Sequence, residues 1–460
     1  MLNEMNRSQA AAAADPYQDT SFFGHPRGLA TLFFTEMWER FSYYGMRAFL
    51  LLYMVTPAAQ GGLGFSDPDG TSIYGTYTGS VWGGAILGGI VADRFLGQYR
   101  SVLIGGIIIA LGHFALAFKA LPFFYSGLAL IVVGTGLLKP NVSTIVGSLY
   151  RTGDPRRDAG FSIFYMGINL GALLGPLVAG YLAQRVGWHV GFACAGIGMT
   201  FGLLQYVLGR KRLQSAIDRL EMEAKAPPAS TAAAAAARET GSGWSFSADE
   251  WKRIAAIVFL FAAATLFWSG YEQAGSTLTL FADRYTRLDL FGVSFPSSWF
   301  QTVQPFFVIV LSPVFAWLWI KLGPREPSVP AKFAWALGFM SMSFAVLIPA
   351  GAMAQAEGVR VSPMWLVMAY FISELGELCL SPIGLSAVTK LAPLRILGLM
   401  MGVWFLSNSF GNKLAGYAAG FISTMTLQSL FGTVTVVLAV SAVVMFLLVR
   451  PIRGLMGGRT

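Results

Sequence analysis

Twelve apolar stretches, each of about 20 residues, recur along this chain of 460 residues. A stretch of that length can cross the hydrocarbon core of a membrane as a helix, which satisfies its own backbone hydrogen bonds in lipid. We expect spans at 28–55, 72–92, 101–118, 124–149, 158–184, 189–209, 254–281, 298–320, 332–353, 362–390, 396–423 and 428–449. The sequence therefore predicts an all-α integral membrane protein with twelve transmembrane helices.

Composition supports this class and argues against others. The chain is 55% hydrophobic and only 12% charged, which is too apolar for a soluble protein of this size. The net charge of +9 comes from Lys and Arg residues spread among short loops, so we expect no nucleic-acid partner. Cys194 and Cys379 both lie in apolar runs, so we expect neither a disulfide framework nor a zinc site.

The segment 210–250 divides the predicted helices into two sets of six. It begins with helical spacing and charge and continues as a Pro-, Ala-, Ser- and Gly-rich linker. It is too short and too polar for an extra pair of helices between the halves. We expect a mobile N-terminal tail at 1–27 without a cleavable signal, a six-helix bundle at 28–209, the linker at 210–250, a second bundle at 251–450 and a tail at 451–460.

The distribution of Lys and Arg predicts the orientation. With the N-terminus in the cytoplasm, the cytoplasmic tails and loops hold 23 of these residues and the outside loops hold five. Short cytoplasmic loops are enriched in Lys and Arg. We therefore expect a multi-pass protein of the cell (inner) membrane with both termini and the linker in the cytoplasm.

A charged stripe interrupts the first predicted span, within the segment EMWERFSYYGMR at 36–47. Glu36, Arg40 and Arg47 fall on one helical face, with Glu39 at its flank. Each ionised group costs roughly 2.5–3.5 kcal/mol at the centre of a bilayer. The stripe must therefore face protein or water, and a polar stripe of this kind indicates a functional site.

The other intramembrane charges fall at two depths. At the outer level Arg47 of the first half matches Glu272 of the second, and at the inner level Lys139 matches Glu377. The alternative is that these charges only tie helices together, which applies most strongly to Glu374 and Lys413. No pair of histidines or carboxylates has metal-ligand spacing within a helix, so we expect no metal site.

Several motifs together resemble the proton-dependent oligopeptide transporters, a branch of the major facilitator superfamily. EMWERFSYYG at 36–45 matches the ExxERFxYYG signature of that family. The resemblance extends over both halves, through GGIVADRFLGQYR at 88–100, GTGLLKPNVST at 134–144, FSIFYMGINLGALLGP at 161–176, GELCLSPIGLSAVTKLAP at 376–393 and MGVWFLSNSFGNKLAG at 401–416. It implies the major facilitator fold, with two six-helix bundles around a central cavity.

The resemblance also implies an activity, which is import of di- and tripeptides together with protons by alternating access. By motif, Arg40 and Lys139 would bind the peptide carboxylate with Tyr44 nearby, while Glu377 and Asn169 would bind the amine. The family pattern assigns proton coupling to the carboxylates of Glu36, Glu39 and Glu377 together with Arg40. It assigns an outer gate to Arg47 and Glu272, with Lys139 as an inner tie. It places side-chain pockets at Trp268, Ser381 and Trp404. A zwitterionic peptide always presents two charges at a set spacing. Cations on one wall of the cavity and an anion on the other can therefore bind a peptide of any sequence.

This chain departs from the family pattern at two pocket positions. Trp82 stands where many members have a tyrosine, and Gln304 replaces an asparagine that often joins amine recognition. Gly75 occupies the position of a histidine found in animal members, so proton coupling cannot use that group. These departures affect the expected choice of peptide and leave the class unchanged.

Three alternatives remain at the level of sequence. The family also contains carriers of nitrate, glucosinolates and other anions, although the intact charged motifs favour a peptide–proton symporter. A receptor with a transporter fold would be expected to lose the charged stripe, and an intramembrane enzyme would need a nucleophile–base pair or a metal cluster. We expect a non-enzymatic transporter that works as a monomer in the lipid bilayer, with the proton as coupling ion and no other cofactor.

Overall fold

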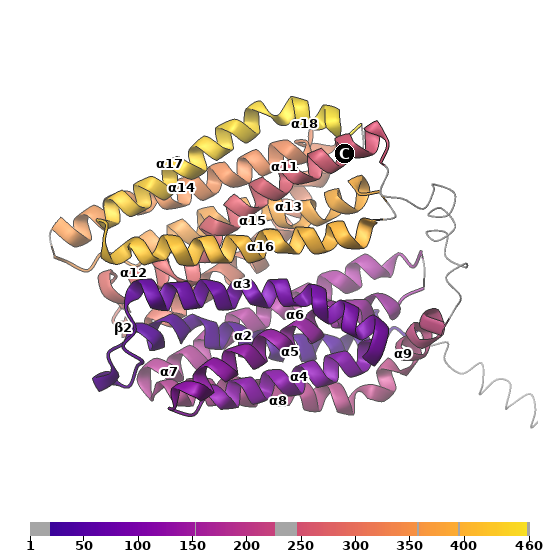
Figure 1. Cartoon of the computed structure of the whole chain (residues 1–460), viewed down its shortest axis with the longest axis horizontal. Coiled ribbons are helices and arrows are strands. Elements are labelled where there is room, and N and C mark those ends of the chain that lie inside the picture. The colour runs from indigo at the N-terminus through magenta and orange to yellow at the C-terminus, as the bar shows by residue number, and fades with distance from the viewer. Residues whose placement is uncertain (1–18, 152, 226–245, 357, 394–395, 458–460) are drawn as a thin grey trace, which may run out of the picture. The chain divides into compact units, whose positions relative to one another are not determined.

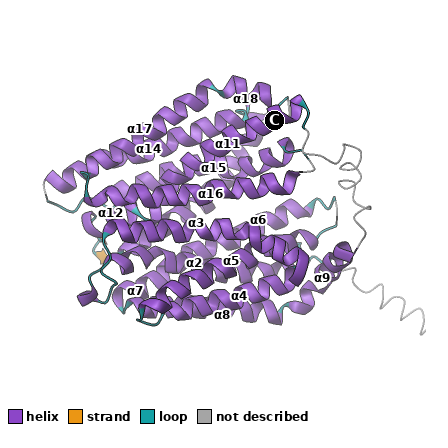
Figure 2. Cartoon of the chain, in the orientation of Figure 1, coloured by secondary structure: helices purple, strands orange, loops and turns teal. Residues whose placement is uncertain are grey.

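The computed structural model describes residues 19–151, 153–225, 246–356, 358–393 and 396–457. Helices dominate this part of the chain (Figure 2), and each of the twelve predicted apolar stretches lies largely within helix. The all-α membrane fold predicted from the sequence is therefore confirmed.

The helices of the first half follow the predicted stretches closely (Figure 1). They are α2 (Arg27–Val55), α3 (Asp67–Val91), α4 (Gln98–Leu116), α5 (Leu121–Ser148), α6 (Arg156–Gly175) with its continuation α7 (Tyr181–Arg185), and α8 (Trp188–Leu208). The π-helical segment η4 (Pro176–Gly180) joins α6 to α7, and another, η3 (Ala92–Leu96), follows α3. Proline at 176 lacks the N–H that a regular helix would use, which accounts for the irregular turn there.

The second half has the same character. Its long helices are α11 (Ala248–Tyr271) with its continuation α12 (Thr277–Tyr285), α13 (Val303–Leu322), α14 (Val329–Ala356), α15 (Met364–Leu391), α16 (Leu397–Ala419) and α17 (Leu427–Leu447). The 3-10 turn η5 (Glu272–Gly275) separates α11 from α12. Ser247 begins α11 with a capping box, accepting from the Glu250 N–H while the Glu250 carboxylate accepts from the Ser247 N–H.

Short elements complete the described part. They are the 3-10 turns η2 (Ala58–Gln60), η6 (Ser297–Thr302), η7 (Gly323–Arg325) and η9 (Gly420–Ser423), the helices α9 (Arg210–Lys225) and α18 (Val449–Leu455), and the strands β1 (Asp289–Leu290) and β2 (Val293–Ser294). The two strands pair antiparallel in a hairpin whose tip, Phe291, is fully open to the surroundings.

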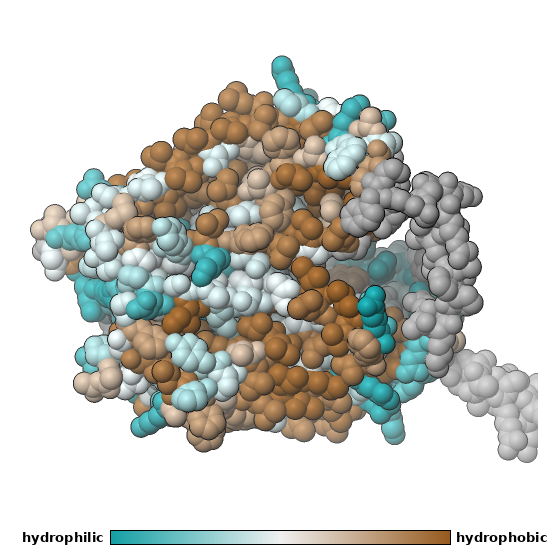
Figure 3. Space-filling view, in the orientation of Figure 1, coloured by the Kyte–Doolittle hydropathy of each residue, from teal (hydrophilic) through white to brown (hydrophobic). Residues whose placement is uncertain are grey.

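Nine helical segments of the described part are both long and apolar enough to cross a membrane. The helices α2, α3 and α16 fall outside this group, and α2 does so because four charged residues interrupt it. Large apolar side chains are exposed across the face seen in Figure 3, which suits contact with lipid tails. The helix α17 exposes Val436, Val437, Val440, Val443, Val444, Phe446 and Leu447. The exact number of twelve spans stays a prediction.

The chain forms two compact units that do not follow the predicted boundary in sequence. The first unit comprises Met1–Tyr44, Gly84–Gly175 and Phe192–Ala226, and the second comprises Gly45–Gly83, Pro176–Gly191 and Pro227–Thr460. The second unit therefore contains the last part of α2 and the first part of α3 together with all helices from α11 onward. We call this region, where α2 ends and α3 begins, the Val55 end of the second unit. The division into bundles at 28–209 and 251–450 stays a prediction.

Glycine permits close helix packing in the first unit. A Cβ atom added at Gly88 of α3 would lie 1.9 Å from the carbonyl oxygen of Gly136 on α5, and one at Gly171 of α6 would lie 2.2 Å from that of Met37 on α2. Both glycines belong to small-residue motifs, GGAILGG and GALLG, which permit helix backbones to approach closely.

Glycine plays the same part in the second unit. A Cβ atom at Gly75 of α3 would lie 2.8 Å from both the Asn412 carbonyl oxygen and the Gly416 Cα of α16. The Ser409 hydroxyl of α16 donates to the Gly79 carbonyl oxygen at 2.7 Å. The beginning of α3 and the end of α16 therefore pack backbone against backbone at the Val55 end.

Several residues within the predicted tail and linker have defined contacts in the first unit. The Asp19 carboxylate accepts from the Arg27 N–H at 2.8 Å, and His25 Nδ1 lies 2.9 Å from the Tyr150 hydroxyl. Arg219 of α9 donates to the Tyr150 carbonyl oxygen at 2.7 Å. The remaining parts of the predicted mobile tail (1–18) and linker (226–245), and the end of the C-terminal tail (458–460), lie outside the described residues.

Candidate substrate and proton site

The charged stripe of α2 forms a buried cluster in the first unit. Arg40 Nε forms a hydrogen-bonded ion pair with Glu39 Oε2 and lies 3.3 Å from Glu36 Oε1. The side chains of all three residues are at most 3% exposed. One guanidinium group thus serves two carboxylates, in agreement with the helical face predicted from the sequence.

The cluster keeps unused polar atoms. Glu36 Oε2, Glu39 Oε1 and Arg40 Nη2 are buried and have no hydrogen-bond partner among the described residues. Buried polar atoms without partners are uncommon in native proteins and call for an explanation such as a functional role. The free donor of Arg40 and the free carboxylate oxygens are suited to an anion and to protons, respectively.

Aromatic rings and one further cation surround the cluster. The Arg40 guanidinium lies 5.3 Å from the ring centre of Tyr43 and 5.9 Å from that of Tyr44, which are favourable cation–π distances. Lys139 of α5, half-buried beside Pro140, interacts electrostatically with Glu36. The predicted group of Arg40, Tyr44 and Lys139 thus lies within one unit around the same carboxylates.

Asn169 lies on α6, which packs against α2 at Arg40. A Cβ atom at Gly171 would lie 2.9 Å from the Arg40 Cβ. The Asn169 side chain is buried, and its amide donates to the Tyr165 carbonyl oxygen of its own helix at 3.0 Å. The Asn169 side chain therefore sits on a helix that adjoins the charged cluster.

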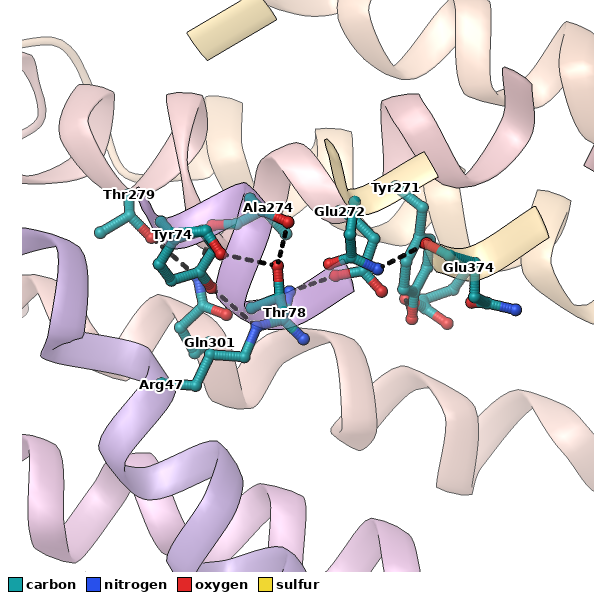
Figure 4. A network of polar contacts seen from close by, with 12 residues as sticks. Arg47, Tyr74, Thr78, Tyr271, Glu272, Ala274, Thr279, Gln301 and Glu374 are labelled. Carbon is teal, nitrogen blue, oxygen red and sulfur yellow. Dashed lines mark hydrogen bonds and ion pairs between the residues drawn. The ribbon is translucent and has the colours of Figure 1, made fainter. Parts of the chain in front are cut away.

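A second polar network joins α2 to η5 at the Val55 end of the second unit (Figure 4). Arg47 forms an ion pair with Glu272, and Arg47 Nε donates to the Tyr74 hydroxyl of α3 at 2.7 Å. Gly275 makes room for this network, because a Cβ atom there would lie 1.9 Å from the Tyr74 hydroxyl oxygen. The predicted pairing of Arg47 with Glu272 is confirmed.

The intramembrane carboxyl groups of α15 form a third cluster, also in the second unit. Glu377 is 6% exposed and faces Glu374 and Ser381 of the same helix. Glu374 is fully buried, accepts from the Tyr271 hydroxyl at 3.0 Å and also faces Gln304 of α13. Of the residues predicted from the sequence, Gln304 and Glu377 thus lie beside Glu374, and Ser381 lies beside Glu377.

Three tryptophans predicted to line pockets also lie in the second unit. Trp268 of α11 is largely buried, its ring packs edge-on against that of Tyr271, and its indole N–H has no partner among the described residues. Trp404 of α16 packs edge-on against Phe333, and a Cβ atom at Gly384 would lie 2.2 Å from its ring. Trp82 of α3 stacks on Phe405 at 6.5 Å.

The predicted site residues divide between the two units. The first unit holds Glu36, Glu39, Arg40, Tyr44, Lys139 and Asn169, and the second holds Arg47, Trp82, Trp268, Glu272, Gln304, Glu377, Ser381 and Trp404. The predicted opposition of Lys139 and Glu377 joins residues of different units and stays a prediction. Among the described residues, no group of three or more His, Cys, Asp or Glu side chains could hold a metal ion.

Sequence reasoning missed several polar partners at the Val55 end. Gln301 of η6 donates to the Ala274 carbonyl oxygen and to the Thr279 hydroxyl, and Arg284 of α12 binds Asp67 of α3 through two hydrogen bonds of 2.7 Å (Figure 4 shows the first group). Asp67 and Arg284 both fall between the stretches expected to span the membrane, where charges are ordinary, so nothing in the sequence singles out this pair.

Comparison with known proteins decides the family. The family model described as the POT family matches residues 99–226 and 229–437, which is well over half of the chain. The chain belongs to the POT family. The family resemblance stated from the motifs is therefore confirmed, and with it the major facilitator fold.

Similar proteins match over nearly their whole length. The chain is 42% identical to the "Uncharacterized transporter YclF" of Bacillus subtilis, with 95% of the chain and 96% of the relative covered. It is 36% identical to a "Di-/tripeptide transporter" of Lactococcus lactis subsp. cremoris, with 95% and 98% covered. A crystal structure of a peptide transporter POT in complex with sulfate superposes with a TM-score of 0.87 at 41% identity, covering 97% of this chain and 99% of the other. This POT-family member is thus a multi-pass membrane transporter and not an enzyme.

Proposed function

We propose that this chain imports di- and tripeptides together with protons, by alternating access to a cavity between the two halves. The POT family supports the class, since its curated relatives include transporters named for di- and tripeptides. The observation that carries the proposal is the buried cluster of Glu36, Glu39 and Arg40, which keeps unused donor and acceptor atoms inside a membrane helix. Packing alone gives no reason to keep three ionisable groups in such a place.

In this proposal the site recognises the peptide through its terminal amine and its terminal carboxylate. Arg40 Nη2, which has no partner among the described residues, donates to the peptide carboxylate together with Lys139, with Tyr44 beside them. Glu377 and Asn169 bind the peptide amine. These contacts recognise atoms that every peptide shares, so the site selects length more strongly than sequence.

Side-chain selection belongs to the apolar wall of the second half. The rings of Trp268 and Trp404, with Ser381 and Gln304, accept varied side chains, and Trp82 adds a further large ring. Aromatic surfaces bind many apolar groups without a strict geometry. Because Trp82 and Gln304 depart from the family pattern, they are the positions at which this chain differs in peptide preference.

Protons enter through the carboxylates. Glu36 and Glu39 share one guanidinium, so a peptide carboxylate that draws Arg40 away leaves them with less positive charge and a higher affinity for protons. Glu377 responds in the same way when Lys139 turns to the peptide. Each proton that moves inward gains about 2.3 kcal/mol per 100 mV of membrane potential, which suffices for substantial accumulation.

The Val55 end serves as the outer gate. Arg47 and Glu272 close it, with the Asp67–Arg284 pair and the packing of α3 against α16 as further ties, while Lys139 pairs with Glu377 on the inner side in the empty carrier. The Lys and Arg distribution supports an orientation with both termini in the cytoplasm and the Val55 end outside. The protein acts as a monomer in the cell (inner) membrane, with the proton as its coupling ion.

Uptake by proteoliposomes tests the proposal. A labelled dipeptide should accumulate when an inward proton gradient is imposed, and a protonophore should abolish the accumulation. Glu39→Gln should lose accumulation yet retain more peptide-for-peptide exchange, because exchange need not move protons, whereas Arg40→Ala should lose both. Accumulation that survives the protonophore would contradict proton coupling, and selective uptake of an inorganic anion would favour the alternative within the family.

A further inference from the structure

Glu374 is a buried carboxyl group for which the roles above have no use. It lies one helical turn before Glu377 on α15 and is fully buried in the second unit. The carboxyl groups of Glu374 and Glu377 are within hydrogen-bond reach of one another. Each also has a buried oxygen, Oε2, without a donor among the described residues.

Two carboxylates in contact cannot both stay ionised at such a site. Like charges at this separation repel, and burial further disfavours each charge, so one proton on the pair removes most of the cost. A single proton between the groups also supplies a donor to their Oε2 atoms, which have none among the described residues. The geometry therefore calls for one protonated and one ionised carboxyl group.

The elements packed against α15 supply no counter-charge to the pair. The only charged residues on α13, α14 and α16 in the described part are Lys321, which lies over the Trp317 ring, Lys332, which pairs with Glu326, and Lys413, which contacts Thr76. On α11 the charged residues all lie in its first turns, and its last residue is Tyr271. Within the second unit, the polar groups that face the pair are therefore Tyr271, Gln304 and Ser381.

We propose that Glu374 and Glu377 share one proton, forming a proton-binding site in the second half of the chain that is additional to the carboxylates of α2. The shared proton resides mainly on Glu374, because Glu374 is the more deeply buried of the two carboxyl groups. Glu377 then remains ionised and available to a cation, which under the proposed function is the peptide amine or Lys139. Loss of the shared proton to water leaves two adjacent carboxylates, which hold such a cation more strongly and oppose its release.

The pair also has a physical connection to the outer gate. Tyr271, which donates to Glu374, directly precedes Glu272, the partner of Arg47, and Figure 4 shows Glu374 next to these two residues. A change in charge on Glu374 alters the acceptor that holds the Tyr271 side chain at the end of α11. Opening of the gate and protonation of the pair are therefore coupled through adjacent residues of one helix end.

Infrared spectroscopy of the purified protein tests the shared proton without any transport. At neutral pH the wild type should show the C=O absorption of a buried protonated carboxyl group, and Glu374→Gln should lose it. The glutamine amide can accept from Tyr271 and donate to Glu377, so it mimics the protonated neighbour and keeps Glu377 ionised. The matched control is Glu39→Gln, which removes a buried carboxyl group that already has Arg40 as a partner and should leave this absorption in place. An unchanged spectrum in Glu374→Gln overturns the proposal.

The pH dependence of peptide binding supplies a second readout. The peptide affinity of the wild type should change at alkaline pH as the shared proton is lost. Over the same pH range the affinity of Glu374→Gln should change about tenfold less, which corresponds to one pKa unit. Tyr271→Phe removes a donor that favours ionised Glu374, so it should move the alkaline change to higher pH. Tyr370→Phe is its control, because the Tyr370 hydroxyl of α15 is buried and has no partner among the described residues.

The two readouts separate this inference from the proposed function on which it rests. A wild type that neither binds nor transports peptides contradicts the proposed function, while the infrared result still decides whether the pair holds a proton. Peptide transport with identical pH profiles in wild type, Glu374→Gln and Tyr271→Phe overturns the shared proton and leaves the proposed function standing. If Glu374→Gln fails to fold, Tyr271→Phe carries the same decision.

Discussion

Arg47 of α2 forms a buried ion pair with Glu272 of η5, although 225 residues separate them in the sequence. Their side chains are 9% and 6% exposed, and Tyr74 fixes the guanidinium from the other side. A pair this deeply buried gains its energy only while both members are present, since each charge alone would be costly. This contact between the first and second halves of the chain therefore requires both charged side chains.

The first prediction concerns the removal of one member of this pair. Glu272→Gln leaves Arg47 buried without a counter-charge, so we expect the free energy of unfolding to fall by roughly 3–5 kcal/mol. The double variant Arg47→Leu with Glu272→Leu should recover most of that loss. Thermal unfolding in detergent measures both, and a double variant less stable than Glu272→Gln would contradict the reasoning.

The second prediction compares this pair with Asp67–Arg284, whose side chains are 14% and 35% exposed. Arg284→Gln should cost about 1 kcal/mol or less, because water and salt screen a partly exposed pair. Raising the ionic strength from 0.1 to 1 M shortens the screening length from about 10 to about 3 Å. High salt should therefore erase the difference between Arg284→Gln and wild type in thermal unfolding, while the Glu272→Gln difference persists.

The third prediction uses two glycines of the same helix. Gly75→Ala would place a methyl group 2.8 Å from backbone atoms of α16, which cannot move without shifting that helix, whereas a Cβ atom at Gly89 meets nothing within 4 Å. We expect Gly75→Ala to lower the free energy of unfolding by about 1–3 kcal/mol, and Gly89→Ala to leave it near the wild-type value or slightly above. Equal melting temperatures for the two variants would show that the contact of α3 with α16 does not matter.

The helices and the charged stripe could be predicted from the sequence because both depend on local patterns. A run of about 20 apolar residues has few alternatives to a membrane helix, and the spacing of Glu36, Arg40 and Arg47 on one face follows from helical geometry. The match of Arg47 with Glu272 followed from depth within the membrane, which orders residues of different helices without knowledge of their packing.

The partners of these residues could not be predicted, because they depend on packing between distant segments. Nothing local reveals that Tyr74 braces Arg47, that Asp67 meets Arg284, or that Tyr271 donates to Glu374. The role of Glu374 stays open from the sequence, with a local structural tie as one alternative, because the position of one intramembrane carboxylate does not reveal its neighbours. The two compact units also cut across the sequence boundary, because contacts at the Val55 end group the end of α2 with the second half.

The fourth prediction concerns His113 of α4, which is fully buried and whose two ring nitrogens have no partner among the described residues. A buried polar group without a hydrogen bond costs about 1–3 kcal/mol. His113→Leu, which has a similar volume, should therefore raise the free energy of unfolding, and His113→Gln should not. A loss of stability in the leucine variant would mean that the imidazole has a partner such as ordered water.

The last prediction is a pH dependence at the loop that follows α5, where His25 lies against the Tyr150 hydroxyl. Burial, and next the charge of Arg156, lower the pKa of His25 below its ordinary value of 6.5. The folded state therefore prefers the neutral imidazole, and the unfolded chain binds more protons as the pH falls below about 6.5. The stability that this group contributes is complete above that pH and declines as the pH falls toward the lowered pKa.

We expect the melting temperature to drop between pH 7 and pH 5, and the drop to be smaller in His25→Gln, which keeps a polar group beside Tyr150 without titrating. Half-buried His189 of α8, whose ring packs edge-on against Tyr53, supplies the control, since His189→Gln removes an imidazole and leaves the contact of His25 with Tyr150 in place. If His25→Gln and wild type lose stability equally on acidification, another group carries the effect.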